Sequence, residues 1–315
     1  MPSTKILIDC DPGHDDAVAI IYAAKHLDLV GVTTTHGNNS LENVTRNALS
    51  VLTLAGLDVP LAVGCEGPIA VRRVHIPNSH GKTGLDGADL PEPDRKPIEM
   101  HAVDFIIDTA RQHQGDLVLA VIGPATNVAM ALKKEPGLAS WLREITVMGG
   151  STGLGNVTPV AEFNCWADPE AASVMYECGA PIRMVGYNVT SRTGTNAAHI
   201  ARLRAGGRIA RTIGDLLHFY LEKQTAMFGY DIAPMHDVCA VVPYMHMDML
   251  TYRHCHVAVE LAGTRTRGMT VCDMRTLTEE GHAMRGVGAA NTQVAVGSDA
   301  RRLIDHVVET LLTYD

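Results

Sequence analysis

Short, almost continuous hydrophobic runs alternate along this chain with longer segments in which hydrophobic residues recur at helical spacing. The runs lie at residues 5–10, 28–35, 116–122, 144–148 and 181–187. They predict buried strands, because a strand with one face in water would alternate hydrophobic and polar positions. The longer segments predict helices and lie at residues 15–27, 41–55, 98–113 and 125–134.

The alternation of strand and helix predicts a mainly parallel sheet with helices on both faces, since such strands are joined by right-handed crossovers. Residues 168–179 (DPEAASVMYECG) show the helix signals most clearly, with Asp168 as N-cap, Pro169 at the first helical position and Gly179 as the stop. No repeat, low-complexity segment or linker divides the chain. We therefore expect one α/β domain over residues 1–315, with its active site at the carboxyl ends of the strands.

Composition narrows the possible functions. With 46% hydrophobic and 19% charged residues, the 315-residue chain is typical of a soluble globular protein with a large core. Its formal net charge of -9 argues against nucleic acid as a partner, because binding to phosphates depends on Lys and Arg.

The remaining features of composition concern location. The seven cysteines contain no CxxC pair, which predicts neither a disulfide framework nor a structural zinc site and fits a reducing compartment. No apolar run has the length of a membrane span, and a strand-like segment at Lys5 leaves no room for a signal peptide. We expect a cytoplasmic protein that does not bind membranes.

Four carboxylates follow the first predicted strand, in residues 9–16 (DCDPGHDD). Asp9 and Asp11 end the strand, and Asp15 and Asp16 open the next helix. One of them would serve as a helix cap, but four like charges in a partly buried site raise one another's pKa unless a cation holds them. The segment therefore predicts a cation site, and oxygen ligands alone indicate Ca²⁺ or Mg²⁺.

Other polar groups occupy comparable turns later in the chain. His236 and Asp237 follow a proline and open a hydrophobic helical run, and Thr126 follows another predicted strand. Asn156, Glu162 and Asn164 lie in a loop among hydrophobic residues, where they serve as loop anchors or bind a polyhydroxy ligand.

These motifs, taken in order, resemble the inosine-uridine-preferring nucleoside hydrolase family. The resemblance spans about residues 5 to 300 and rests on DCDPGHDDA at the start, Gly37-Asn38, GPATN, MGG, AEFN with DPEAA, and the late His236-Asp237. It implies a single α/β domain that hydrolyses the N-glycosidic bond of purine or pyrimidine ribonucleosides to ribose and a free base. It also implies a tightly bound Ca²⁺ and a homodimer or homotetramer.

The resemblance implies a role for each matching residue. The Ca²⁺ ligands would be Asp11, Asp16, the carbonyl of Thr126 and Asp237. Asp11 would be the base that activates a water molecule at the metal. The residues that hold ribose would be Asp15, Asn38, Asn156, Glu162 and Asn164.

The departing base needs a proton, and His236 fits this role by position and by its near-neutral ordinary pKa. His80 matches a second histidine that the family places near the base. Phe228 and Tyr230 lie in a segment with a glycine that would close over the base, although aromatic residues at this spacing are as often part of a core.

Two alternatives to this interpretation remain open. One is the same chemistry on a modified nucleoside, and the other is a catalytically silent protein that binds nucleoside or ribose. The presence of both Asp11 and His236 argues against the silent protein. A phosphoryl-transfer enzyme would need a Lys and a Thr shortly after the first motif, where Pro12-Gly13-His14 supplies neither. The sequence leaves the base preference undecided.

Overall fold

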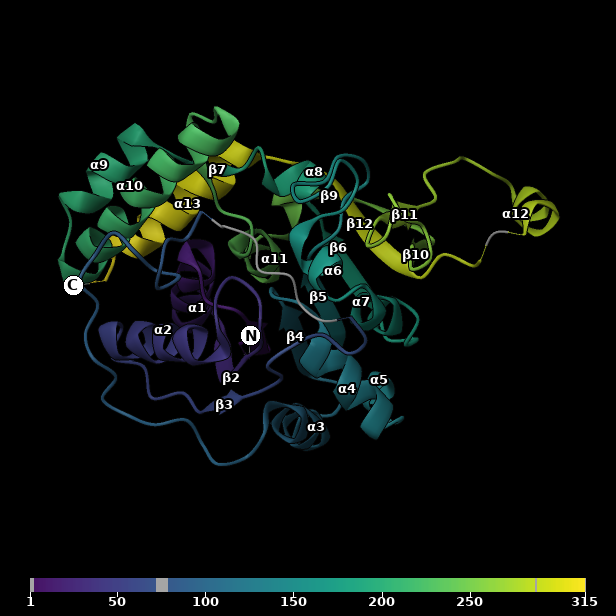
Figure 1. Ribbon diagram of the computed structural model, residues 1–315, viewed down its shortest axis with the longest axis horizontal. Helices are drawn as coiled ribbons and strands as arrows, with labels where there is room; N and C mark the ends of the chain where they lie inside the picture. Colours follow the sequence, from purple (N-terminus) through teal and green to yellow (C-terminus); the bar gives the residue numbers. More distant parts are fainter. Residues whose placement is uncertain (1–2, 72–78, 287, 315) are drawn as a thin grey trace.

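Strands that are far apart in the sequence lie side by side in one large sheet (Figure 1). The computed structural model describes residues 3–71, 79–286 and 288–314. In these residues eight strands are ordered β3-β2-β1-β4-β5-β6-β12-β9. Their bounds are Leu61–Val63 (β3), Asp28–Thr34 (β2), Lys5–Cys10 (β1), Leu117–Val121 (β4), Glu144–Met148 (β5), Ile182–Val185 (β6), Thr292–Ser298 (β12) and Leu250–Cys255 (β9).

All neighbouring pairs in this sheet are parallel except β12 and β9, which pair antiparallel at one edge. Two small antiparallel pairs lie outside the sheet. Their strands are Gly194–Asn196 (β7) with Ile232–Pro234 (β8), and Val257–Val259 (β10) with Thr270–Cys272 (β11). The predicted mainly parallel sheet is confirmed, and its parallel strands bring the carboxyl ends of β1, β2, β4 and β5 to one edge.

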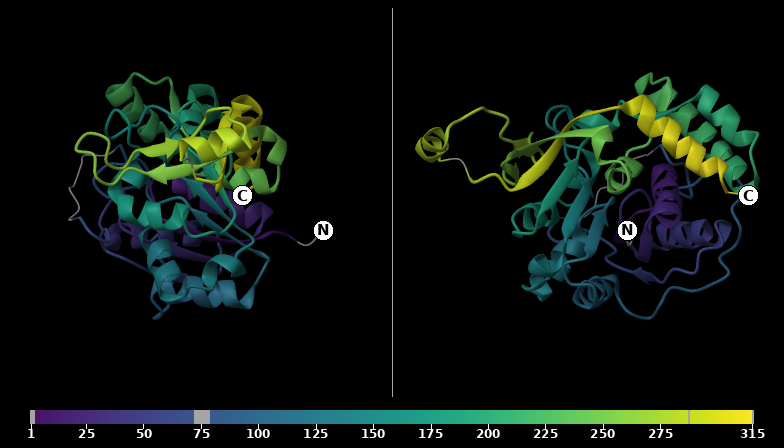
Figure 2. Two further views of the ribbon diagram at one scale, coloured as in Figure 1. Left: turned by 90° about the vertical axis from the view of Figure 1, so that its right-hand side faces the viewer. Right: turned by 180° about the vertical axis from the view of Figure 1, so that it is seen from behind.

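Helices cover both faces of the sheet, as Figures 1 and 2 show. One face packs against His14–His26 (α1), Leu41–Leu54 (α2), Arg208–Phe228 (α10), Val238–Val241 (α11) and Ala300–Leu312 (α13). The other face packs against Ala102–Gln112 (α3), Thr126–Lys134 (α4), Leu138–Trp141 (α5) and Pro169–Tyr176 (α7). Shorter elements complete the chain, namely Phe163–Ala167 (α6), Tyr187–Thr190 (α8), Ala197–Arg204 (α9), Val242–Tyr244 (η1), Met247–Met249 (η2) and Glu279–Arg285 (α12).

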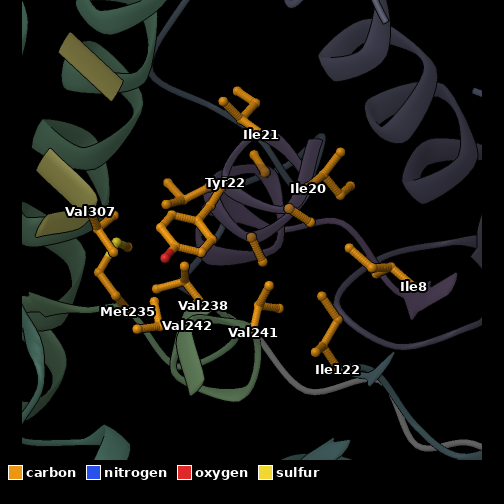
Figure 3. Packing of buried hydrophobic residues seen from close by; sticks show 14 of the residues in the cluster. Ile8, Ile20, Ile21, Tyr22, Ile122, Met235, Val238, Val241, Val242 and Val307 are labelled. Carbon is orange, nitrogen blue, oxygen red and sulfur yellow. The ribbon is translucent and has the colours of Figure 1, made fainter. Parts of the chain in front are cut away.

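The alternation of side chains along a strand divides the core into two clusters. In β1, Ile6 and Ile8 face one cluster and Leu7 faces the other. Figure 3 shows the first cluster, where Tyr22 and Ile20 of α1 lie near Val238 and Val241 of α11. Helix α1 is thus fixed by apolar packing on several sides, and its first turn carries the acidic residues Asp15 and Asp16.

The predicted strands match β1, β2, β4, β5 and β6 to within two residues at each end. The largest difference among the predicted helices is that α3 begins at Ala102 instead of residue 98. The cause is tertiary, because the backbone N–H of Ile98 donates to the carbonyl of Leu61 at the sheet edge, 2.8 Å away. The helix begins after His101, whose side chain caps it by accepting from the backbone N–H of Val103.

Between β9 and β12 the chain leaves the body of the domain. The pair β10 and β11 lies beside the sheet, and α12 is at the far end of a projecting arm in Figures 1 and 2. Within the described ranges, no helix combines the length and the apolar character needed to cross a lipid bilayer.

Candidate active site

A cavity opens at the carboxyl edge of the sheet, where several segments remote in sequence meet. Its volume is about 790 Å³, part of it open to solvent. Most residues that the sequence singled out line it, namely Asp11, Asp15, Asn38, His80, Asn156, Glu162, Asn164, Phe228, His236 and Asp237. The topology of the large sheet explains part of this convergence, since Asp11 and Asp15 follow β1, Asn38 follows β2, and the loop with Asn156, Glu162 and Asn164 follows β5. His236 and Asp237 instead follow β8, which belongs to a separate small sheet.

Three carboxylates lie close together at this site. Asp15, Asp16 and Asp237 each place a carboxylate oxygen within 4.8 Å of the other two, and all three side chains are buried. Asp16 also accepts from the backbone N–H groups of Gly13 (2.8 Å) and Asp11 (3.3 Å), so the start of α1 fixes its orientation. Within the described residues this is the one group of side chains with such spacing that suits a metal ion.

The ionised forms of the three buried carboxylates need a nearby positive charge to be stable. Burial raises the pKa of Asp15 to about 8 and that of Asp16 to about 6, and burial followed by the neighbouring carboxylates raises the pKa of Asp237. None of the ion pairs between described residues includes Asp15, Asp16 or Asp237. A cation bound here would remove the repulsion and keep all three ionised, so the residues present fit a metal ion with oxygen ligands.

Asp11 lies beside this cluster, but its carboxylate does not meet the 4.8 Å spacing with the three. Its Oδ2 accepts from the backbone N–H of Asn38 at 2.6 Å. A Cβ added at Gly37 would come within 1.8 Å of the same oxygen, so this close approach requires glycine. The remaining early acidic residue, Asp9, has a structural role, because its Oδ1 accepts from Thr33 at 2.6 Å and Asn127 at 2.8 Å.

Thr126 is the first residue of α4. Its hydroxyl donates to Oδ2 of Asp168 at 2.6 Å, and Asp168 is in turn the N-cap of α7. The hydroxyl is therefore committed to structure. The predicted metal ligand at this position is the carbonyl oxygen of Thr126, and that prediction is compatible with the contact.

The loop residues expected to hold ribose have well-defined partners. Asn164 donates its amide hydrogens to the carbonyls of Ile122 (2.9 Å) and Met148 (3.0 Å). These bonds leave the Oδ1 of Asn164 as the acceptor that it presents at the cavity. Glu162 accepts from the backbone N–H groups of Gly150 (2.8 Å) and Asn164 (3.0 Å), although its burial raises its pKa to about 7.

Asn156 differs from these two residues. Its Oδ1 is buried and has no hydrogen-bond partner among the described residues. A buried polar atom without a partner is costly, and a ligand hydroxyl in the cavity would supply the missing bond.

Two predicted histidines face the cavity from different segments. Nδ1 of His236 lies 2.7 Å from the hydroxyl of Thr190, and burial lowers the pKa of His236 to about 4. His80 is buried, and its pKa is well below the ordinary value because of burial and then of nearby His14 and His236. Both imidazoles are therefore neutral at pH 7.

His14, the first residue of α1, contacts His80 directly. Its Nδ1 lies 2.9 Å from Nδ1 of His80, and its Nε2 lies 2.8 Å from the carbonyl of Asp86. The two imidazoles stack with Tyr220, with ring centroids 5.1 Å from each. His14 thus supports His80 from behind.

The aromatic segment after α10 contributes one of its two predicted residues directly. Phe228 lines the cavity, whereas Tyr230 is absent from the described lining and stacks on Phe228 with a centroid distance of 5.5 Å. Tyr230 also shares a 2.7 Å hydrogen bond with the hydroxyl of Tyr187, which does line the cavity. Tyr230 therefore does not line the described cavity itself, and it contacts two residues that do, Phe228 and Tyr187.

Sequence reasoning missed several lining residues, among them Ser79, Tyr187, Tyr220 and Gln224. Tyr220 and Gln224 are four apart on α10, so they share one helix face, and Gln224 donates to Ser79 at 3.1 Å. Two polar groups on an otherwise apolar helix face were the available signal. Asn188, next to Tyr187, lies outside the described lining and donates to the carbonyl of Ala295 at 3.0 Å.

Comparison with known proteins agrees with this geometry. Residues 6–305 match the model of a family described as inosine-uridine preferring nucleoside hydrolase. The chain is 39% identical over 314 residues to the pyrimidine-specific ribonucleoside hydrolase RihA of Enterobacter sp. (strain 638), covering 98% of each chain. Its structure resembles the plant nucleoside hydrolase PpNRh1, with a TM-score of 0.90 at 30% identity over 99% of this chain and 100% of that one. It also resembles a purine-preferring ribonucleoside hydrolase from Gardnerella vaginalis, with a TM-score of 0.89 at 30% identity over 98% of both chains.

Proposed function

The chain belongs to the inosine-uridine preferring nucleoside hydrolase family, and from this premise we propose that its cavity hydrolyses ribonucleosides with a Ca²⁺ ion in the acidic cluster. The enzyme breaks the N-glycosidic bond and releases ribose and a free base. The observation that carries the proposal is the meeting of Asp15, Asp16 and Asp237 at a cavity that asparagine, histidine and further acidic side chains line.

The donor set supports Ca²⁺ as the ion. Asp11, Asp16, Asp237 and the carbonyl of Thr126 would hold it, and carboxylate and carbonyl oxygens in a large, flexible shell suit Ca²⁺ better than Mg²⁺. When bound, the ion neutralises the carboxylates and orients a water molecule and two ribose hydroxyls. Asp15 lies within the same cluster and would hold a ribose hydroxyl against it.

Asp11 is the residue that takes the proton from the attacking water. Its carboxylate lines the cavity, and the 2.6 Å bond from the N–H of Asn38 fixes Oδ2 in position. A carboxylate held within reach of the water is a suitable general base.

Ribose binding falls to asparagine and glutamate side chains that line the same cavity. Asn164 presents an acceptor because its amide hydrogens are bound to two backbone carbonyls, and Asn156 has an unpartnered buried oxygen. Asn38 and Glu162 would complete the set. As the glycosidic bond breaks, ribose gains oxocarbenium character, and the surrounding carboxylates stabilise that positive charge.

The leaving base requires help at the far end of the cavity. His236 has its Nδ1 held by Thr190, so Nε2 is the nitrogen that it offers to the base. The imidazole is neutral in the free protein, so it would have to take up a proton when the nucleoside binds before Nε2 could transfer one to the base as negative charge develops there. His80, on the other side of the cavity, would assist.

Pyrimidine ribonucleosides are the proposed preferred substrates. The support is the 39% identity to a pyrimidine-specific relative, against 30% to a purine-preferring one. Comparing kcat/KM for uridine, cytidine, inosine and adenosine tests this choice, and equal or higher values for the purine nucleosides would contradict it.

Reaction in ¹⁸O-labelled water tests the chemistry itself. We expect the heavy oxygen at C1 of the released ribose and a rate that does not depend on added phosphate. Ribose 1-phosphate as the product would show a phosphorylase, and binding of nucleoside without turnover would show a silent binding protein. The Asp11→Asn variant should lose the labelled product, since it removes the proposed base and one of the proposed Ca²⁺ ligands.

A further inference from the structure

Two loops at the carboxyl edge of the sheet enclose the carboxylate of Asp11. The first loop follows β2 and contains Gly37 and Asn38, whose backbone approaches Oδ2. The second follows β4 and contains Gly123, where an added Cβ would lie 2.7 Å from Oδ1. The same second loop leads into Thr126 at the start of α4.

The side chain of His36 joins the two loops. Nε2 of His36, the residue before Gly37, lies 2.8 Å from the hydroxyl of Thr126. Because that hydroxyl donates to Asp168, it must accept from His36, which fixes the imidazole with its hydrogen on Nε2. Asp168 also accepts from the backbone N–H groups of Ile69 (3.0 Å) and Ala171 (3.1 Å), so the far end of this chain is anchored.

This chain of bonds is buried throughout. His36 and Asp168 are fully buried, and Thr126 is 1% exposed. The backbone of His36 is held as well, since its N–H donates to the carbonyl of Cys65 at 3.0 Å. Hydrogen bonds in such a setting are expensive to break, because the groups left behind have no water to bind.

We propose that His36 is a positioning residue for the cation site. It fixes the loop that orients Asp11 relative to Thr126, so that a carboxylate and a carbonyl from different strands stay at the spacing of one ion. The inference rests on the proposed function, in which Asp11 and the carbonyl of Thr126 both bind Ca²⁺. His36 is absent from the described cavity lining, so its contribution passes through these two residues.

The physical gain is preorganisation. Hydrogen bonds that orient metal ligands before the metal binds reduce the conformational entropy that the protein loses on binding. Removal of such bonds weakens metal affinity about 10–100-fold. Asn127 also ties the start of α4 to the end of β2, by a 3.0 Å bond to the carbonyl of Thr34. Without the bond from His36, the loop with Asn38 would be held less firmly against Thr126, and the ion would have to order the loop on binding.

Calcium titration of the metal-free protein tests this role. His36→Leu keeps much of the volume but removes the donor, and we expect its Kd for Ca²⁺ to rise about 10–100-fold. His36→Gln places an amide N–H near the former Nε2, and we expect it to restore the Kd to within a few-fold of the wild type. The melting temperature of the metal-free forms, measured in parallel, reports any loss of stability that has nothing to do with the ion.

The partner variants make the test independent of His36→Leu folding. Thr126→Val keeps the carbonyl but loses the hydroxyl, and it should raise the Kd, whereas Thr126→Ser should not. In the double variant with His36→Leu, the two effects should be less than additive because both remove one bond. Thr45→Val is the matched control, since it removes a buried 2.9 Å bond between α2 and Thr34, the last residue of β2, and leaves the bond between His36 and Thr126 in place.

The Ca²⁺ titrations distinguish failure of the positioning role from failure of the proposed function. An unchanged Kd in both His36→Leu and Thr126→Val would overturn the positioning role, even if their metal-free melting temperatures fall. Additive effects, or an equal rise in Thr45→Val, would overturn it as well. A wild-type protein that binds no Ca²⁺ would instead contradict the proposed function on which the inference rests.

Discussion

The hydroxyl groups of Tyr187 and Tyr230 lie 2.7 Å apart and join α8 to the segment that follows α10. The ring of Tyr187 lines the cavity and lies 5.8 Å from that of His236, centroid to centroid. This bond therefore holds Tyr187, which forms part of the cavity wall, through Tyr230, which lies outside the described lining.

Removal of that bond should loosen the wall. In Tyr230→Phe we expect KM for nucleosides to rise up to about tenfold with a smaller change in kcat, because a neutral hydrogen bond contributes about 0.5–1.5 kcal/mol. Tyr314→Phe serves as the control, since its hydroxyl donates to the carbonyl of Ile21 in α1 (2.9 Å) and Tyr314 is absent from the described lining. An unchanged KM in Tyr230→Phe would show that Tyr187 is ordered without Tyr230.

His236 should matter most when the leaving base needs a proton. His236→Ala is expected to lower turnover of inosine or uridine by about 10²–10⁴, the usual range for general acid catalysis, and to spare a nitrophenyl riboside. Calcium affinity should survive, since Asp237 is the proposed ligand. Equal losses on both substrates would mean that His236 positions ribose or supports the metal site, and the acid would then be sought at His80 or solvent.

Calcium removal should affect both activity and stability. We expect a chelator to abolish turnover and to lower the melting temperature, because an ion present at 100 times its Kd stabilises the fold by about 2.7 kcal/mol. Asp237→Asn should lose most of this calcium-dependent shift. Asp248→Asn should retain it, since Asp248 lies on the surface and pairs with Arg302. Zinc as the ion in an active preparation would refute the assignment of Ca²⁺.

A histidine cluster between α1 and α13 predicts a stability change with pH. His306 lies 2.9 Å from the hydroxyl of Tyr22, with its ring centroid 5.3 Å from that of His26 and 4.5 Å from that of His246. Burial, followed by nearby positive groups, lowers the pKa of both His26 and His306 below 6.5. The unfolded chain thus binds more protons as the pH falls below about 6.5, and the stability due to the neutral rings is lost in that direction.

The measurement is urea unfolding at pH 7.5, 6.5 and 5.5. His306→Gln should lose less unfolding free energy on acidification than the wild type, because glutamine bonds Tyr22 without titrating. His218→Gln, on the exposed face of α10, should follow the wild type. If His306→Gln also follows the wild type, the cluster does not contribute to the pH dependence.

Much of the site could be predicted because its signals are local. The hydrophobic runs determined β1, β2, β4, β5 and β6, and the acidic turn after β1 pointed to a cation at the strand ends. Parallel strands joined by crossovers bring such ends together in any fold of this class, so the convergence of Asp11 and Asn38 on one cavity followed from order along the chain. His236 follows β8, which lies outside the large sheet, so only the tertiary structure decided its place.

What only the tertiary structure decided are the contacts that fix those groups in position. The sequence does not indicate that His36 bonds Thr126 or that His14 bonds His80. It also does not indicate that the amide of Asn164 donates to two backbone carbonyls. Such partners lie far apart in the chain, and their pairing depends on how crossover helices and loops pack, to within a fraction of an ångström. Hydrophobic periodicity and helix capping depend on neighbours a few residues away, so they determine the elements, while the orientation of each functional atom is set by the packed whole.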